Sequence, residues 1–226
     1  MQTIAIISQK GGAGKSTLAV HLGVEAAKEG KNVAIIDLDP QASSASWGDR
    51  RADELPVVIS AHASRLPQQM KLVEENGGEF LVIDTAPHAD SAALDAARAS
   101  DLVLVPCAPN IFDIEAALRT CDLLKAAGRP FFVVLNEVAP VGRSEADEAE
   151  AVFKERALPV CPARVAKRVA FSRCLSEGQV ASEFDPADKG GAEIARLHHF
   201  VCAQLQVCTG APVQPSSKEE DHVQQA

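Results

Sequence analysis

Residues 3–17 read TIAIISQKGGAGKST, and this stretch decides the fold of the chain. It begins with an apolar run of strand length, passes through a loop with three glycines and ends in Lys15-Ser16-Thr17, where a helical pattern starts. Glycines allow successive backbone N–H groups to point at an anion, and the helix N-terminus adds the positive end of its dipole. The order of strand, glycine-rich loop and helix therefore predicts a phosphate-binding loop.

The loop residues indicate how a nucleoside triphosphate would be held. In such loops the lysine contacts the β- and γ-phosphates and the hydroxyl that follows it contacts Mg²⁺, so we assign these roles to Lys15 and Ser16. The usual spacing is not met, because Gln9 rather than glycine stands six residues before Lys15. We expect ATP and Mg²⁺ as cofactors, with nucleotide contacts from Lys10, Gly11, Gly12, Ala13, Gly14, Lys15, Ser16 and Thr17.

The rest of the chain alternates apolar runs with helical patterns. The runs are continuous rather than alternating, which indicates strands buried on both faces of a parallel sheet. We predict an α/β fold with a doubly wound, mostly parallel sheet and helices on both faces. The expected strands are 3–8, 33–37, 57–59, 80–84, 102–105 and 131–135, and the expected helices are 16–29, 64–75, 90–99, 112–127, 144–156 and 191–205.

Three acidic residues follow two of these strands. Asp37 and Asp84 are the last residues of the runs at 33–37 and 80–84, and Asp39 stands two residues after the first run. Ligands of open α/β sheets bind beyond the carboxyl ends of the strands, where these side chains would meet. Asp84 has the form of a residue that holds Mg²⁺ through water, so the sequence predicts a metal-dependent phosphate site at this edge.

Composition limits the remaining classes. The 226 residues, 46% of them hydrophobic, fit one domain over residues 1–206, and the polar residues 207–226 are expected to be disordered. No signal peptide or membrane span is evident, so we expect a cytoplasmic protein. The six cysteines form no C-x-x-C pair and are interpreted as small buried residues rather than metal ligands.

Two motifs resemble one known family. The segment Lys10-Gly11-Gly12-Ala13-Gly14-Lys15-Ser16 resembles the deviant Walker A motif of the ParA/MinD superfamily, and Asp37-Leu38-Asp39-Pro40-Gln41 is similar to its D-x-D-P-Q. The resemblance extends over nearly the whole chain and is strongest to short ParA-type partition ATPases and to McdA-like ATPases that position protein organelles. It implies a P-loop NTPase fold of the SIMIBI type.

The resemblance also implies residue roles. Lys10 would cross to the phosphates of a partner subunit, Asp39 would orient the attacking water and Asp37 would support the Mg²⁺ shell, which makes Lys10, Lys15 and Asp39 the catalytic residues. Pro109-Asn110-Ile111-Phe112-Asp113 is similar to the start of the helix beside the dimer face. Base contacts would come from Asn136 and from Phe184, Asp185 and Pro186.

The function that the resemblance implies is a switch. ATP would join two subunits in a sandwich dimer that binds nonspecific DNA, and a ParB-like or cargo-adaptor protein would stimulate hydrolysis, for partition of a plasmid or chromosome or for positioning of another cargo on the nucleoid. A MinD-like membrane ATPase would need an amphipathic basic C-terminus, which is not seen. An ATP-dependent biosynthetic ligase sharing the loop is the alternative from another class. We expect neither membrane binding nor transcriptional autoregulation.

A net charge of −9 requires a local basic patch for any contact with DNA. Residues 164–173 contain four basic residues and no acidic one. We expect this cluster to contact DNA phosphates without reading sequence, usefully only when dimerisation doubles it. The predicted DNA-binding residues are Arg164, Lys167, Arg168 and Arg173.

Overall fold

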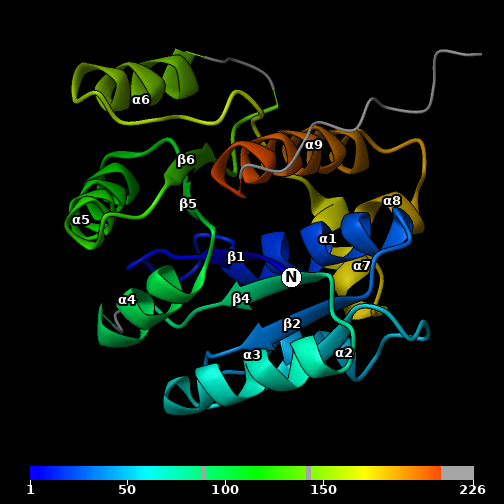
Figure 1. Ribbon diagram of the computed structural model, residues 1–226. Helices are drawn as coiled ribbons and strands as arrows, with labels where there is room; N and C mark the ends of the chain where they lie inside the picture. Colours follow the sequence, from blue (N-terminus) through cyan, green and yellow to red (C-terminus); the bar gives the residue numbers. More distant parts are fainter. Residues whose placement is uncertain (88–89, 141–143, 210–226) are drawn as a thin grey trace, which may run out of the picture.

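A computed structural model describes residues 1–87, 90–140 and 144–209. Within them, six strands form one sheet in the order β3-β2-β4-β1-β5-β6, and every neighbouring pair is parallel (Figure 1). The predicted doubly wound parallel sheet is therefore confirmed. The strands are β1 (Gln2–Ile6), β2 (Val33–Asp37), β3 (Val57–Ser60), β4 (Phe80–Asp84), β5 (Leu102–Cys107) and β6 (Phe131–Leu135).

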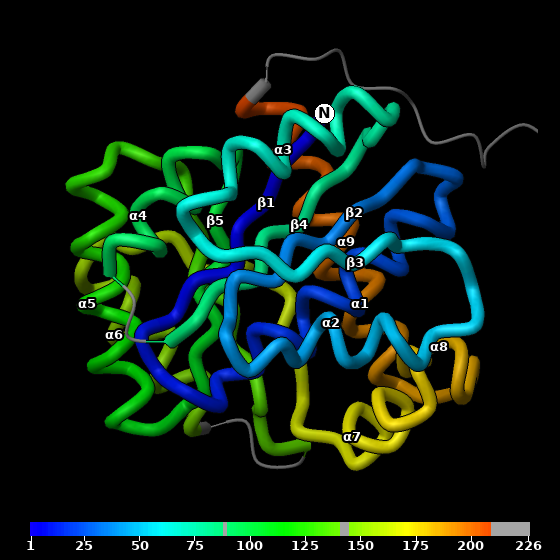
Figure 2. The backbone as a smooth tube through the Cα atoms, turned by 90° about the horizontal axis from the view of Figure 1, so that it is seen from below, coloured from blue at the N-terminus to red at the C-terminus, as the bar shows by residue number. Residues whose placement is uncertain are grey.

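The helices lie on both faces of this sheet (Figures 1 and 2). A short 3₁₀ turn at Ala63–Arg65 precedes α3. Along β1 the side chains alternate between the two faces, as a pleated strand requires. The helices are α1 (Lys15–Lys28), α2 (Ser43–Gly48), α3 (Leu66–Glu75), α4 (Asp90–Ala99), α5 (Ile111–Ala127), α6 (Ser144–Glu155), α7 (Val169–Ser176), α8 (Ala181–Phe184) and α9 (Lys189–Thr209).

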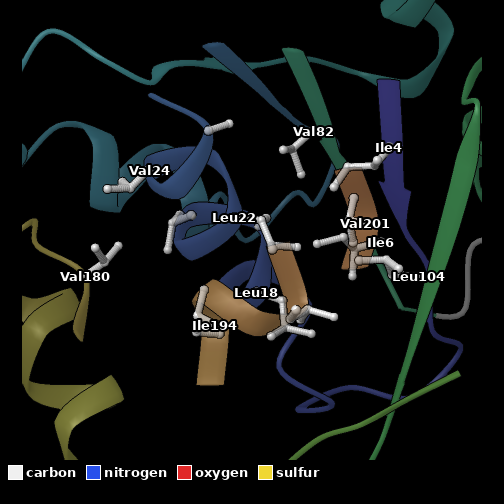
Figure 3. Close-up of a cluster of buried hydrophobic side chains, with 14 of the residues drawn as sticks. Ile4, Ile6, Leu18, Leu22, Val24, Val82, Leu104, Val180, Ile194 and Val201 are labelled. Atoms are coloured by element: carbon white, nitrogen blue, oxygen red, sulfur yellow. The ribbon is translucent and has the colours of Figure 1, made fainter. Parts of the chain in front are cut away.

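Each face has its own apolar core. Ile4 and Ile6 of β1 belong to a cluster with residues of α1, α7 and α9, and Figure 3 shows Leu18 and Leu22 of α1 beside Val201 of α9 in this cluster. Ala5 and Ile7 belong to the second cluster, with residues of α3, α4, α5 and α6. The central strands β2, β4 and β5 are buried along their whole length, which explains their continuous apolar sequences.

Strand register brings the acidic strand ends together. Asp84 is the Cα partner of Ile6 on one side and of Asp37 on the other, so the carboxyl ends of β1, β2 and β4 lie in one row. The loop after β1 starts from this row. The register thus places the glycine-rich loop next to both buried carboxylates.

Some boundaries differ from the expectations. Strand β1 ends at Ile6 rather than at residue 8, and α2, α7 and α8 were not predicted, because they are too short for a helical period to stand out. Helix α9 continues to Thr209, so residues 207–209 are helical rather than part of a disordered tail. The rest of that predicted tail lies outside the described residues.

Cysteine burial agrees with the sequence interpretation for four of the six side chains. Cys107, Cys121, Cys161 and Cys174 are buried, whereas Cys202 is half-buried and Cys208 is exposed. None of the helices in the described ranges is long and apolar enough to cross a membrane.

Truncation of Leu22 should strongly destabilise the fold. Its side chain is fully buried in the core between α1, α9 and the sheet. Leu22→Ala removes buried methyl groups and leaves a cavity, which should lower the free energy of unfolding by about 2–5 kcal/mol in urea titrations. Leu72→Ala on α3, where the side chain is 48% exposed, is the control and should change it by no more than about 0.5 kcal/mol. Equal losses in the two variants would contradict this assignment of the core.

Candidate nucleotide-binding site

The glycine-rich loop joins β1 to α1 in a conformation that its glycines permit. Gly12 and Gly14 have φ angles of 78° and 85°, and Gly14 caps the N-terminus of α1. A Cβ atom at Gly14 would lie 2.3 Å from Nδ2 of Asn136. Both the left-handed conformation and this close approach therefore require glycine at position 14.

Asn136, which follows β6, contacts the glycine-rich loop. It is buried and donates a hydrogen bond from Nδ2 to the carbonyl of Ala13 at 2.9 Å. The structure therefore gives this side chain a loop-holding contact. Its expected contact with adenine stays a prediction.

Lys15 is buried at the start of α1, where it is positioned for an anion. Its Nζ donates to the carbonyl of Lys10 at 3.2 Å, which bends the side chain back over the loop. Burial lowers the pKa of Lys15, while the nearby carboxylates of Asp84 and Asp39 oppose that shift and favour the ammonium form. A buried cation at a helix N-terminus beside loop amides suits a phosphate group.

Asp84 lies under the loop with one unsatisfied oxygen. The Ser44 hydroxyl donates to Oδ2 at 2.7 Å, whereas the buried Oδ1 has no hydrogen-bond partner among the described residues. Burial raises the pKa of Asp84 to about 6, against the opposing effects of the Ser16 and Ser44 hydroxyls and of Lys15. An orphaned buried carboxylate oxygen beside a hydroxyl is a donor set that fits Mg²⁺. The residues present therefore fit the expected metal.

Asp37 and Asp39 have different surroundings. Asp37 is fully buried, and its oxygens accept hydrogen bonds from the backbone N–H groups of Asp39 and Ala45, each at 3.0 Å. Asp37 thereby shapes the turn that leads into α2, and burial raises its pKa. Asp39 is half-buried and accepts from the N–H of Gln41 at 2.9 Å. The roles expected of Asp37 toward Mg²⁺ and of Asp39 toward water stay predictions.

An open cleft of about 650 Å³ runs along the loop. Phe184, Asp185 and Pro186 are not among its lining residues. Phe184 is the last residue of α8 and the other two follow it; all three are exposed, and Ser182 of the same helix contacts the second half of α1. Their expected base contacts stay a prediction. The cleft is lined by Gly11, Gly12, Gly14, Lys15, Ser16, Thr17, Asp39 and Gln41, and also by residues that the sequence did not single out, among them Val20, Trp47, Arg50, Glu137 and Leu175.

A second cavity, of about 370 Å³, is lined by Met1, Thr3 and Asp101 among others. These residues stand near the amino ends of the strands, where open α/β sheets do not bind their ligands. The cleft along the loop is therefore the candidate site for a nucleotide.

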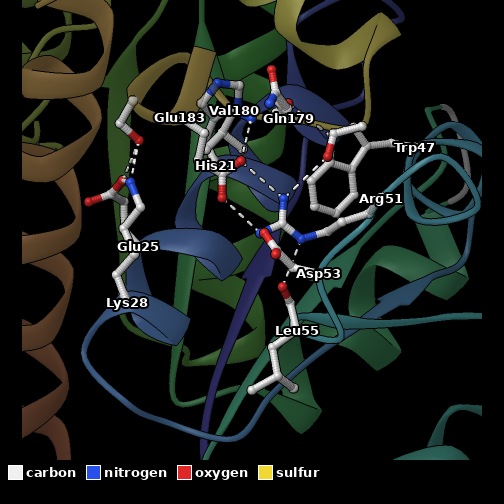
Figure 4. Close-up of polar contacts among 12 residues, drawn as sticks. His21, Glu25, Lys28, Trp47, Arg51, Asp53, Leu55, Gln179, Val180 and Glu183 are labelled. Atoms are coloured by element: carbon white, nitrogen blue, oxygen red, sulfur yellow. Dashed lines mark hydrogen bonds and ion pairs between the residues drawn. The ribbon is translucent and has the colours of Figure 1, made fainter. Parts of the chain in front are cut away.

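A network around Arg51 fixes the wall of the cleft (Figure 4). The Arg51 guanidinium is nearly buried, makes two hydrogen bonds of 2.8 and 3.0 Å to Glu183, and donates to the carbonyl of Leu55 at 2.7 Å. It also lies 5.0 Å from the ring of Trp47, whose indole N–H donates to the carbonyl of Gln179 at 3.0 Å. These contacts join α2 and the residues after it to α8 and the turn before it.

His21 connects the start of α8 to α1. Its Nε2 accepts from the N–H of Ala181 at 3.1 Å, and its Nδ1 lies 2.7 Å from the carbonyl of Thr17. Together the contacts require a neutral ring protonated on Nδ1. Burial lowers the pKa of His21 to about 4, which agrees with that neutral form.

Lys10 points away from the loop and toward α5. Its ammonium pairs with Asp113, which is 5% exposed. Asn110 caps α5 by accepting from the N–H of Asp113 at 3.1 Å. Beside this pair, Ile111 and Phe112 are 61% and 72% exposed. The two lysines of the loop are therefore held separately, one inside the loop and one at an apolar surface.

The predicted DNA-binding cluster is largely paired with carboxylates from other segments. Arg164 pairs with Asp147 and Glu150. Lys167 pairs with Glu137 at 3.1 Å, and Arg168 pairs with Glu193 at 2.5 Å. Arg173 is exposed, and no described residue forms an ion pair with it. Residues 164–173 contain four basic residues and no acidic one, but in the folded chain carboxylates from other segments pair with three of the four.

Comparison with known proteins agrees with the geometry of the loop. The CobQ/CobB/MinD/ParA nucleotide binding domain matches residues 4–181, from β1 to the start of α8. The chain belongs to this family. The resemblance noted from the loop and the D-x-D-P-Q segment is thereby confirmed, and the family places the chain among ParA/MinD-type ATPases.

The matches to individual relatives span most of this chain and most of each relative. The chain is 33% identical over 181 residues to "Maintenance of carboxysome distribution protein A" of Gloeobacter kilaueensis, covering 78% of this chain and 82% of the relative. It is 30% identical over 188 residues to "Protein ParA" of Rhizobium radiobacter, covering 79% and 84%. The septum site-determining protein MinD of Pyrococcus horikoshii, solved with Mg-ADP, has the same fold with a TM-score of 0.73 at 20% identity, over 92% of this chain and 98% of that chain.

Asp84→Asn should stabilise the nucleotide-free protein at neutral pH. The folded-state pKa of Asp84 is raised from 3.8 to about 6, so the folded state holds this proton more tightly and ionisation costs stability. Asn removes that cost. The gain should be small below about pH 4, grow toward about pH 6 and reach about 1–3 kcal/mol at neutral pH in urea titrations with EDTA.

The same variant should lose Mg²⁺-dependent nucleotide binding in calorimetry. Asp49→Asn, which changes an exposed carboxylate at the end of α2, is the control and should shift the free energy of unfolding by no more than about 0.5 kcal/mol. If Asp84→Asn lowered the free energy of unfolding at neutral pH, the buried carboxylate would not destabilise the fold and the prediction would be wrong.

Proposed function

We propose that this chain is an ATP-driven positioning switch that binds Mg-ATP in the cleft, dimerises with ATP bound and carries a cargo over DNA. The observation that supports the proposal best is the separation of the two loop lysines. Lys15 is buried against its own loop, whereas Lys10 projects toward α5 beside an exposed apolar surface. A lysine that its own loop does not use is available to the phosphates of a second copy.

The chemistry of the switch needs mainly positioning and charge neutralisation. Lys15 and the loop amides would hold the triphosphate, Ser16 and Asp84 would hold Mg²⁺, and Asp39 would orient the attacking water at the edge of the cleft. The bound metal would neutralise charge that develops on the phosphate oxygens. Closure of the cleft by a second subunit would exclude bulk water from the phosphates.

Dimerisation would use the surface around α5. Ile111 and Phe112 are large apolar side chains exposed next to the Lys10–Asp113 pair. A second copy placed there would bury both and bring its own Lys10 to the opposite nucleotide. Hydrolysis removes the γ-phosphate that the crossing lysine contacts, so the dimer would dissociate afterwards.

The relatives' names indicate what the switch moves. One is a carboxysome distribution protein, another is ParA, and a third is the chromosome-partitioning ATPase Soj of Thermus thermophilus, 24% identical over 242 residues. We propose that the dimer binds the nucleoid, in the cytoplasm, and that a ParB-like or cargo-adaptor protein stimulates hydrolysis. Arg173 and Lys167 are the exposed members of the predicted basic cluster. Arg173 would make the main DNA contact, because Lys167 already pairs with Glu137.

Variants of the loop should separate the steps of the switch. Lys15→Ala should weaken ATP binding about ten- to hundredfold, since it removes charged hydrogen bonds to the phosphates. Asp39→Ala should bind Mg-ATP normally but hydrolyse it about a hundredfold more slowly and remain a dimer. Lys10→Ala should bind ATP and stay monomeric. Calorimetry, phosphate release and light scattering with ATP measure these three properties.

Asp113→Asn is the control for Lys10→Ala. It breaks the same ion pair while leaving Lys10 intact, so it should keep ATP-dependent dimerisation. If Lys10→Ala and Asp113→Asn were both monomeric with ATP, the pair itself would be required and the proposed crossing of Lys10 would be wrong.

DNA binding should depend on Arg173 and on the dimer. Wild-type protein should bind DNA of any sequence with ATP but not with ADP, with an affinity that falls steeply as salt rises. Arg173→Glu should weaken binding and reduce the salt dependence, because each dimer loses two phosphate contacts. Lys71→Glu on α3 changes the net charge equally at an exposed position and should bind like wild type. Anisotropy titrations across a salt series measure the affinity for DNA. If both variants lost the same affinity, the effect would come from net charge and not from Arg173.

A further inference from the structure

Three potential metal ligands meet at the end of α1 that is farther from the phosphate loop. Glu29 caps the C-terminus of α1, and His198 and Cys202 belong to α9. One carboxylate oxygen, one imidazole nitrogen and the sulfur all lie within 4.8 Å of one another. Oxygen, nitrogen and sulfur donors in one cluster are typical of zinc sites in proteins.

Helical spacing aligns the two ligands on α9. His198 and Cys202 are four residues apart and therefore lie on the same side of the helix. The His198 ring is buried and packs edge-on against Phe80 with centroids 6.1 Å apart, which restricts its orientation. Cys202 is half-buried and Glu29 is exposed, so an ion can reach the cluster from solvent.

The distances suit a small tetrahedral ion. Oε1 of Glu29 lies 3.3 Å from Nδ1 of His198, and Sγ of Cys202 lies 4.0 Å from Nδ1 and 3.5 Å from Nε2 of the same ring. With ordinary bond lengths, adjacent ligand atoms of tetrahedral zinc stand about 3.3–3.6 Å apart. The carboxylate and imidazole already have that separation, and a rotation of the Cys202 side chain would bring in the sulfur.

We propose that Glu29, His198 and Cys202 form a zinc-type metal site with water in the fourth position. The sequence interpretation treated all six cysteines as buried small residues, and Cys202 departs from it because its sulfur faces a nitrogen and an oxygen ligand. The site is separate from the nucleotide cleft, and it does not rest on the proposed switch.

Lys31 occupies the position of a competing cation. Its ammonium lies 2.9 Å from Oε2 of Glu29 and 3.8 Å from Sγ of Cys202. The cluster therefore already holds one positive charge, supplied by the chain itself. A metal ion would have to displace this ammonium, which sets the affinity lower than the three ligands alone would give.

A bound ion would tie the P-loop helix to α9. The first turn of α1 carries Lys15 and Ser16, and its last turn leads into Glu29. Coordination would join that last turn to a helix that is distant in sequence. Since the unfolded chain does not keep the three ligands together, the ion should raise the unfolding temperature.

Titration of the nucleotide-free protein with Co²⁺ tests the site. A cobalt–thiolate site absorbs through charge transfer from sulfur, which a carboxylate-bound ion at the phosphate loop does not show. One Co²⁺ per chain should produce this band, and Zn²⁺ should displace it and raise the unfolding temperature. Cys202→Ser should abolish the band and weaken Zn²⁺ binding about tenfold or more.

Two further variants make the result specific. Cys208→Ser changes an exposed cysteine on the same helix and should keep the band, while circular dichroism confirms that every variant is folded. Lys31→Met should tighten binding several-fold, because it removes the competing ammonium. A band that survives in Cys202→Ser, or that is missing in wild type and in Lys31→Met, would overturn the proposal.

Discussion

The parallel register of β1, β4 and β2 is the constraint on which the rest of the structure depends. Asp84 pairs in register with Ile6 and with Asp37, so the start of the phosphate loop and two carboxylates share one edge of the sheet. A shift by one residue would turn Asp84 to the opposite face. The two apolar cores fix the register, since Ile4 and Ile6 belong to one and Ala5 and Ile7 to the other.

The buried charged groups beside the loop suit ligand binding but lower the stability of the ligand-free fold. Burial raises the pKa of Asp84 to about 6, so ionisation of this carboxyl opposes folding, and one of its oxygens has no hydrogen-bond partner within the described part of the chain. Lys15 is likewise buried, and its pKa is lowered by the same desolvation. Lys15 and Asp84 are thus buried charges with incomplete pairing. A phosphate group and a divalent cation that bind together would supply the missing partners.

Much of the fold was predictable because its signals are local. Continuous apolar runs marked the strands, and the residues from Lys10 to Thr17 marked the loop. Side-chain contacts escaped prediction: Asp37 accepts hydrogen bonds from the backbone N–H groups of Asp39 and Ala45, and Arg168 pairs with Glu193, 25 residues away. The wall formed by Trp47 and Leu175 escaped too, because nothing in the local sequence places α2 and α7 beside the loop. The lone tryptophan, soon after the D-x-D-P-Q segment, was the one available signal.

The ion pair between Lys10 and Asp113 also affects apparent affinity. Any external anion that recruits Lys10 competes with a partner fixed in the same molecule, so only the fraction of molecules with an open pair can respond. If that fraction is about one in ten, the apparent affinity for the external anion falls about tenfold. If chains associate through Lys10 as proposed, the strength of this intramolecular contact sets the protein concentration at which association begins.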